Sequence, residues 1–144
     1  MAYDTGKNEE IIYGQSAAGV FTGTGDIAFF FAGYQPQRLR RVAVLITTAL
    51  TVTSSILSLD LQPTAGSAAG RLTAWAGTLT ITTALGAQGK VMVTPELNLE
   101  LTPGAILIVN QTQASTAGAG RIAVYTEFRW EAVANLSAMT QLAS

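Results

Sequence analysis

The residues that most often perform chemistry in proteins are scarce in this sequence. It has no histidine and no cysteine, so the commonest general base, the commonest transition-metal ligand and every thiolate mechanism are missing. Its nine Asp and Glu residues are scattered, without the convergent pair that a glycosidase or an aspartic protease needs. Glu96 and Glu100 share a face if one strand covers both, but two unrelated surface acids are the favoured interpretation of that spacing. We therefore expect no enzyme activity, cofactor or metal.

Two glycine-containing segments invite a phosphate-binding interpretation. Gly23-Thr24-Gly25-Asp26 lacks the third glycine and the following helix of a dinucleotide-binding fingerprint. Gly89-Lys90-Val91 lacks the upstream glycine and the Ser or Thr of a P-loop. Neither segment predicts a nucleotide site.

Three of the eight basic residues form the one basic cluster of the sequence, Arg38-Leu39-Arg40-Arg41. No second cluster or aromatic platform accompanies it, and the net charge is −1, so we expect no nucleic-acid binding. A solvated patch or a contact between subunits is the favoured interpretation, in which the arginines would pair with acids on a partner. Arg38, Arg40 and Arg41 are therefore candidate partner contacts.

The composition is unusual for a soluble monomer. Only 12% of the residues are charged, whereas 49% are hydrophobic, and an ordinary globular chain carries about 25% charged residues. Such a surface predicts a protein that is covered by partners in an assembly. Thr and Ser interrupt the uncharged runs, so we expect no membrane span, and the acidic N-terminal residues predict no secretion signal and synthesis in the cytoplasm.

The elements that must position these residues are short strands, because apolar and β-branched residues recur at every second position. Gly- and Pro-containing turns separate them. The pattern predicts an all-β fold, an antiparallel, jelly-roll-like β-sandwich of about eight to nine short strands. The expected strands cover residues 18–22, 26–32, 38–47, 57–61, 72–83, 90–93, 97–101, 105–111 and 121–130.

The two ends differ from the middle. We expect an N-terminal arm at residues 1–16, the sandwich at 17–130 and a C-terminal tail at 131–144, with the arm and tail docking on a neighbour or, for the tail, folding back as a short helix. In Phe29-Phe30-Phe31 at least one ring must point outward unless both faces are buried. The apolar candidates for partner contacts are Tyr3, Ile11, Ile12, Tyr13, Phe30, Leu136, Met139 and Leu142.

The run of residues 35–52 leads to a Pro-Thr-Ala-Gly-Ser loop, to Leu101-Thr102-Pro103-Gly104-Ala105, to the loop at residues 115–120 and to a long last strand. Over roughly residues 18–139 this layout resembles the decoration, or cement, proteins of tailed bacteriophage heads. The resemblance implies a non-enzymatic virion protein that binds the outside of the capsid and bridges neighbouring major capsid protein subunits. It also implies a dimer or trimer, and it carries over no site residues.

A carbohydrate- or receptor-binding module of a virion fibre or tail is the alternative function. It would stack a sugar on an exposed aromatic side chain in a concave site, whereas a cement protein would bury its tryptophans and expose flat apolar faces. The candidate stacking residues are Tyr34, Trp75, Tyr125 and Trp130.

Overall fold

The computed structural model describes residues 12–32, 36–63 and 70–128, and all their regular structure is β-strand. Within this part of the chain no helix is long and apolar enough to cross a membrane. The strands are β1 (Ile12–Val20), β2 (Gly25–Phe31), β3 (Gln37–Thr51), β4 (Ser55–Gln62), β5 (Leu72–Thr73), β6 (Leu79–Ile81), β7 (Val91–Val93), β8 (Leu99–Leu101), β9 (Ile106–Gln113) and β10 (Ala117–Phe128).

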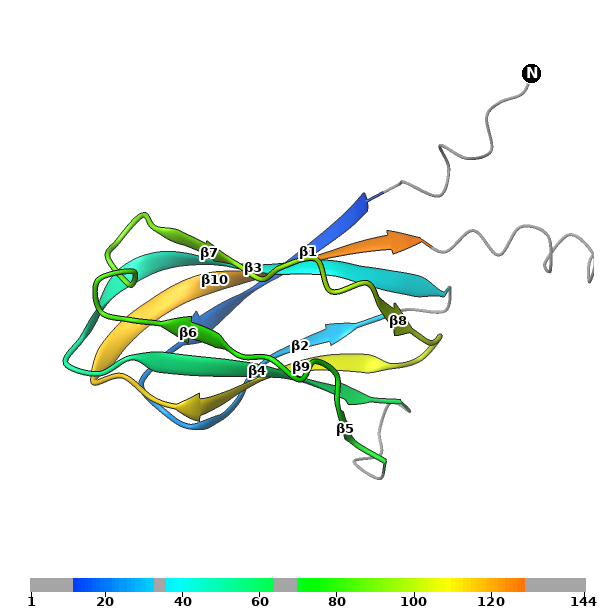
Figure 1. The fold of residues 1–144 in the computed structure, drawn as a ribbon, viewed down its shortest axis with the longest axis horizontal. Helices are drawn as coiled ribbons and strands as arrows, with labels where there is room; N and C mark the ends of the chain where they lie inside the picture. The colour runs from blue at the N-terminus through cyan, green and yellow to red at the C-terminus, as the bar shows by residue number, and fades with distance from the viewer. Residues whose placement is uncertain (1–11, 33–35, 64–69, 129–144) are drawn as a thin grey trace, which may run out of the picture.

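The strands form two antiparallel sheets that stack as two layers (Figure 1). Sheet A has the order β1-β10-β3, and both β7 and β8 pair with the far side of β3. Sheet B has the order β2-β9-β4, and both β5 and β6 pair with the far side of β4. This arrangement confirms the predicted antiparallel β-sandwich.

The pairing of the strands is nested. The first strand pairs with the last, β2 pairs with β9, β3 pairs with β7 and β8, and β4 pairs with β5 and β6. One long hairpin folded over into two sheets gives this pattern, which is the jelly-roll topology. Each sheet thus has four strand positions. At one edge of each sheet the fourth position is divided between two short strands, β7 and β8 in sheet A and β5 and β6 in sheet B.

The interruption in sheet B explains why the strand count exceeds the predicted eight or nine. The segment expected as one strand at residues 72–83 is split into β5 and β6. The strand expected at residues 97–101 begins only at Leu99, because Asn98 has a φ of 53°, in the left-handed region where a strand cannot continue. The break separates Glu96 from Glu100, so the shared strand face considered for these two acids does not form.

The sheet also reaches into the predicted N-terminal arm. Strand β1 begins at Ile12 and pairs with β10 along its whole length, so residues 12–16 belong to sheet A. Residues 1–11 and 129–144 lie outside the described residues, and the proposed arm and tail therefore stay predictions.

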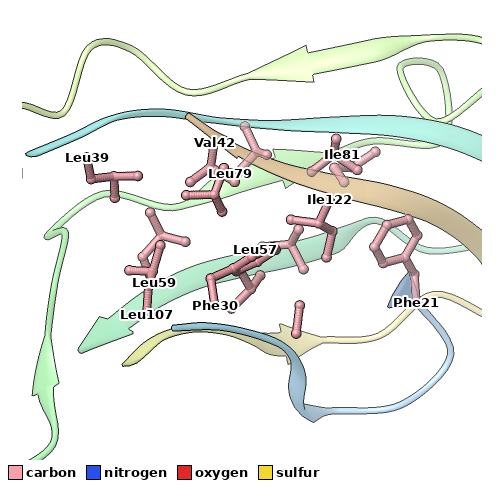
Figure 2. Packing of buried hydrophobic residues seen from close by; sticks show 14 of the residues in the cluster. Phe21, Phe30, Leu39, Val42, Leu57, Leu59, Leu79, Ile81, Leu107 and Ile122 are labelled. Atoms are coloured by element: carbon pink, nitrogen blue, oxygen red, sulfur yellow. The ribbon is translucent and has the colours of Figure 1, made fainter. Parts of the chain in front are cut away.

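The core lies between the two sheets, where inward side chains from both layers interdigitate (Figure 2). Phe30, Leu57 and Leu107 come from sheet B, Ile122 comes from sheet A, and Phe21 closes one end just after β1. Each is at most 5% exposed. Burial of a side chain of this size contributes about 1.5–3 kcal/mol, so these residues hold the layers together.

A β-bulge adjusts the phase of β3. Before the bulge the inward residue is Leu39, and after it the inward residues are Val42 and Val44. The spacing from Leu39 to Val42 breaks strict alternation. The register with β10 shifts at this point, because Arg41 pairs with Tyr125 and Leu39 pairs with Thr126. The extra residue, Arg40, lets both halves of the strand face the core.

Candidate interaction surfaces

The outward side chains of sheet A form what we call the sheet A face. On β10 they are Arg121, Ala123, Tyr125 and Glu127, which alternate with the buried Ile122, Val124 and Thr126. The register places β3 residues directly beside them and continues the rows onto β1 and β7. The rows are Ala18, Arg121, Leu45 and Val91; Ser16, Ala123, Ala43 and Val93; and, on β10 and β3, Tyr125 and Arg41 followed by Glu127 and Arg38.

One part of this face is apolar and exposed. Leu45 is 40% exposed, and its neighbours on the edge strand, Val91 and Val93, are 56% and 45% exposed. Ala43 and Ala123 fill the middle of the face with small side chains. Single exposed apolar residues are ordinary, but a contiguous group of them on the outer side of a sheet is a candidate interaction surface.

The other part of the face holds the predicted basic cluster, but acids of the same chain neutralise it. Arg40 donates hydrogen bonds to Glu96 and, over 2.8 Å, to Glu127, and Arg41 lies 3.7 Å from Glu96. These bonds raise the pKa of Arg40, with Glu96 as the main cause, and the bond from Arg40 lowers the pKa of Glu96. Acids of the same chain thus lie beside Arg40 and Arg41, and the role of these two arginines as partner contacts stays a prediction.

Arg38 lies at the end of the same face, beside Glu127 on β10 and beside Glu100 on β8. Its Nε is buried and has no hydrogen-bond partner in the described part of the chain. Three arginines and three glutamates thus share this end of sheet A, and the cluster is balanced in charge.

The outer face of sheet B is organised by Arg71. Its guanidinium donates to Asp26 over 2.8 and 2.6 Å and to Asp60 over 3.0 and 2.7 Å, and Asn110 also donates to Asp26 over 2.7 Å. Hydrogen bonding from Arg71 lowers the pKa of Asp26, although burial opposes the shift. Both aspartates are therefore engaged by a cation, and among the described residues no group of three or more Asp, Glu, His or Cys could hold a metal ion.

The same face exposes two aromatic rings. Phe29 is 59% exposed and Phe31 is 42% exposed, both on the edge strand β2, whereas Phe30 is 5% exposed and belongs to the core. The choice of Phe30 as the outward contact is therefore wrong. Strict alternation along β2 turns Phe30 inward with Ala28 and Ala32 and turns its two neighbours outward. Any contact made by this segment falls to Phe29 and Phe31.

The other predicted contacts are at the ends of the chain. The backbones of Ile12 and Tyr13 lie in β1, opposite Glu127 and Thr126 of β10, and their side chains are outside the described part. The remaining ones, also outside it, are Tyr3, Ile11, Leu136, Met139 and Leu142.

Two of the aromatic residues considered for sugar stacking, Trp75 and Tyr125, lie in the described chain. Trp75 is half-buried and packs against the core, and a Cβ at Gly77 would lie only 2.4 Å from its ring. Tyr125 is 41% exposed on the sheet A face. Tyr34 and Trp130 lie outside the described residues.

Sequence reasoning missed Leu45, Val91, Val93 and Arg71 as surface residues of interest. The alternation of apolar residues in 42–46 predicted a strand, but only the phase imposed by the bulge shows that Leu45 points outward. Arg71 offered no sequence signal, because its two aspartates lie 45 and 11 positions away.

The topology places the protein among the jelly-roll β-sandwiches. Exposed apolar side chains lie on each outer face. No family model and no curated protein matches the chain. Among solved structures, it is similar to the structure of infectious bursal disease virus Gx strain, with a TM-score of 0.37 and 14% identity. The match covers 82% of this chain and 33% of that chain, so the chain spans only that share of its neighbour's length. At this TM-score the similarity does not bear on function.

Proposed function

We propose that the protein is a non-enzymatic structural component of a virion. In this proposal it is made in the host cytoplasm, binds the outer surface of a bacteriophage capsid as a homo-oligomer, and bridges neighbouring subunits of the major capsid protein. The jelly-roll sandwich is the fold that the resemblance to phage decoration proteins implies.

The observation that carries the proposal is the presence of exposed apolar side chains on both outer faces. A bridging protein needs at least two contact surfaces that point in different directions. Leu45, Val91 and Val93 lie on sheet A, and Phe29 and Phe31 lie on sheet B, on the opposite side of the sandwich. Aromatic side chains are the most frequent anchors of protein interfaces, which favours the sheet B face as the surface that meets the capsid.

The charges support the same interpretation. Only 12% of the residues are charged, and the arginines of the basic cluster are balanced by glutamates of the same chain. Attachment would therefore rest on apolar contact rather than on long-range attraction, and its affinity should change little with ionic strength.

The experiment is co-sedimentation of the full chain with expanded, empty shells assembled from the major capsid protein of the same phage. We expect saturable binding, reduced about tenfold or more by Phe29→Ser, since an interface anchor contributes about 1.4 kcal/mol or more. Val52→Ser is the matched control, because Val52 is 81% exposed and lies outside both faces, in the turn after β3.

Two results would overturn the proposal. One is an absence of binding by the unmodified, folded protein over the whole concentration range. The other is an equal loss of binding in the two serine variants, which would remove Phe29 and its face from the contact. Retention of the unmodified protein on a glycan array, without binding to shells, would point instead to a carbohydrate-binding module.

A further inference from the structure

The two central strands of sheet A place complementary residues side by side on its outer face. Their outward residues form four cross-strand pairs, of which two place an arginine beside a glutamate or an aromatic ring, one joins two alanines and one places an arginine beside a leucine. The pairs are Arg121 with Leu45, Ala123 with Ala43, Tyr125 with Arg41, and Glu127 with Arg38.

This pairing has a consequence for symmetry. A two-fold axis parallel to β10 and β3, and midway between them, exchanges the two strands when a second copy lies face to face. Each β10 residue of one copy then lies over its own β3 partner residue from the other copy. Residues that are complementary side by side are thereby complementary across the interface, and each contact occurs twice.

The chemistry of the stacked pairs is favourable. Glu127 of one copy, which already accepts a bond from Arg40 of its own chain, would face the Arg38 side chain of the other copy and add an ionic contact at that end of the interface. Tyr125, which is 41% exposed, would receive the exposed guanidinium of Arg41 on its ring.

The shape of the face also fits a second sheet. The small side chains of Ala43, which is 9% exposed, and Ala123 occupy the centre, and sheets that pack face to face lie about 10 Å apart. Leu45, Val91 and Val93 add apolar area beside them. Arg121 forms no ion pair within the described chain and donates to Ser16 Oγ on the edge strand over 3.0 Å, which holds its charge toward the rim.

We infer that the sheet A face binds a second copy of this chain about a two-fold axis between β3 and β10. This inference does not depend on the capsid role. The second copy does not cover the outer face of sheet B, where Phe29 lies, and the inference assigns the dimer rather than the trimer as the unit that forms through sheet A.

The first test is sedimentation equilibrium of the full chain with a charge introduced at the centre of the face. Ala123→Glu places one carboxylate per copy against Ala43 of the other copy, and we expect the dimer dissociation constant to rise about tenfold or more. Ala84→Glu is the matched control, because Ala84 is exposed in the turn after β6, and its dissociation constant should equal that of the unmodified chain.

A second test does not depend on the stability of a charged variant. The chain has no cysteine, so a single introduced thiol reports one position. We expect Ala123→Cys to be cross-linked into dimers by a short bismaleimide, and Thr80→Cys, on the outward side of sheet B, to stay monomeric under the same denaturing analysis.

The inference is overturned by a monomeric unmodified chain at all concentrations, by equal dissociation constants for the two glutamate variants, or by cross-linking through Thr80→Cys instead of Ala123→Cys. Binding to capsid shells tests the capsid proposal independently of the dimer. Phe29→Ser should reduce it and leave the dimer intact, so failure of the capsid proposal and failure of the dimer give different results.

Discussion

Arg71 and Asp26 form a bidentate ion pair that spans the outer face of sheet B. Arg71 precedes β5 at one edge of the sheet, whereas Asp26 lies on β2 at the other edge. The two bonds measure 2.8 and 2.6 Å, and Asp60 on β4 accepts two further bonds from the same guanidinium. One side chain therefore links strands that do not pair with each other.

Replacement of Arg71 by Lys should destabilise the sandwich by about 1 kcal/mol. The ammonium of Lys keeps the charge but lacks the planar fork that binds two carboxylates at once. The measurement is urea unfolding followed by circular dichroism. Arg121→Lys is the control, because Arg121 forms no ion pair in the described chain, and a loss of equal size in both variants would contradict the role of the bridge.

The same ion pair predicts a dependence of stability on pH. The pKa of Asp26 is lowered from its ordinary value of 3.8, chiefly by the bond from Arg71. The unfolded chain therefore takes up the proton first as the pH falls, and the contribution of the pair, complete above about pH 5, is lost progressively below the ordinary pKa.

Urea midpoints measured between about pH 7 and about pH 2.5 test this dependence. Asp26→Asn should lower the midpoint at neutral pH and flatten its decline in acid, because the titrating group is gone. A decline in this variant as steep as that of the unmodified chain would assign the acid sensitivity to other carboxylates, such as Glu96, whose pKa is lowered by Arg40.

The strands could be predicted because the signal is local. Alternation and turn residues identified the central strands, and the sandwich is confirmed. The edge positions were harder. Residues 72–83 have strand-like composition, yet only Leu72–Thr73 and Leu79–Ile81 find partners on β4, and composition does not report pairing.

The surfaces were less predictable because they depend on phase and on long-range partners. Phe30 lies in a run of three identical residues, and such a run does not indicate which ring points inward. Arg40 and Arg41 resembled a free basic cluster because Glu96 and Glu127 lie 56 and 87 positions from Arg40 in the chain. Such neutralisation becomes visible only when the register of β3 with β10 and the turn before β8 are known.

Gly120→Ala should destabilise the fold by about 1–3 kcal/mol through overpacking. A Cβ at this position would lie 2.5 Å from the backbone oxygen of Leu45 and 3.1 Å from the ring of Phe21. A carbonyl oxygen within a sheet cannot move aside as a side chain can, so β3 and β10 would have to separate locally.

The control for this prediction is Gly23→Ala, because a Cβ at Gly23 meets no atom within 4 Å. Its midpoint of thermal unfolding should match that of the unmodified chain or exceed it slightly, as expected when an unstrained glycine is replaced. If the two alanine variants unfold at the same temperature, the close approach of the strands at Gly120 does not constrain the sandwich.

Gln37 and Thr126 form a buried polar contact that ties the two sheets together. Thr126 Oγ1 donates to Gln37 Oε1 over 2.6 Å, and Gln37 Nε2 donates to the carbonyl of Ala32, just after β2 in the opposite layer. Both side chains are 4% exposed. Thr126→Val keeps the shape but leaves Gln37 Oε1 without its donor, which should cost about 1–3 kcal/mol.

A double-mutant cycle with Gln37→Met isolates this contact. In the Gln37→Met background the acceptor is already absent, so Thr126→Val should cost less than in the unmodified chain, with a coupling energy of about 0.5–3 kcal/mol. Urea unfolding of the four proteins supplies the measurement. Strictly additive losses would show that the hydroxyl of Thr126 stabilises the sandwich through another partner, and that the layers near Ala32 are held by apolar packing alone.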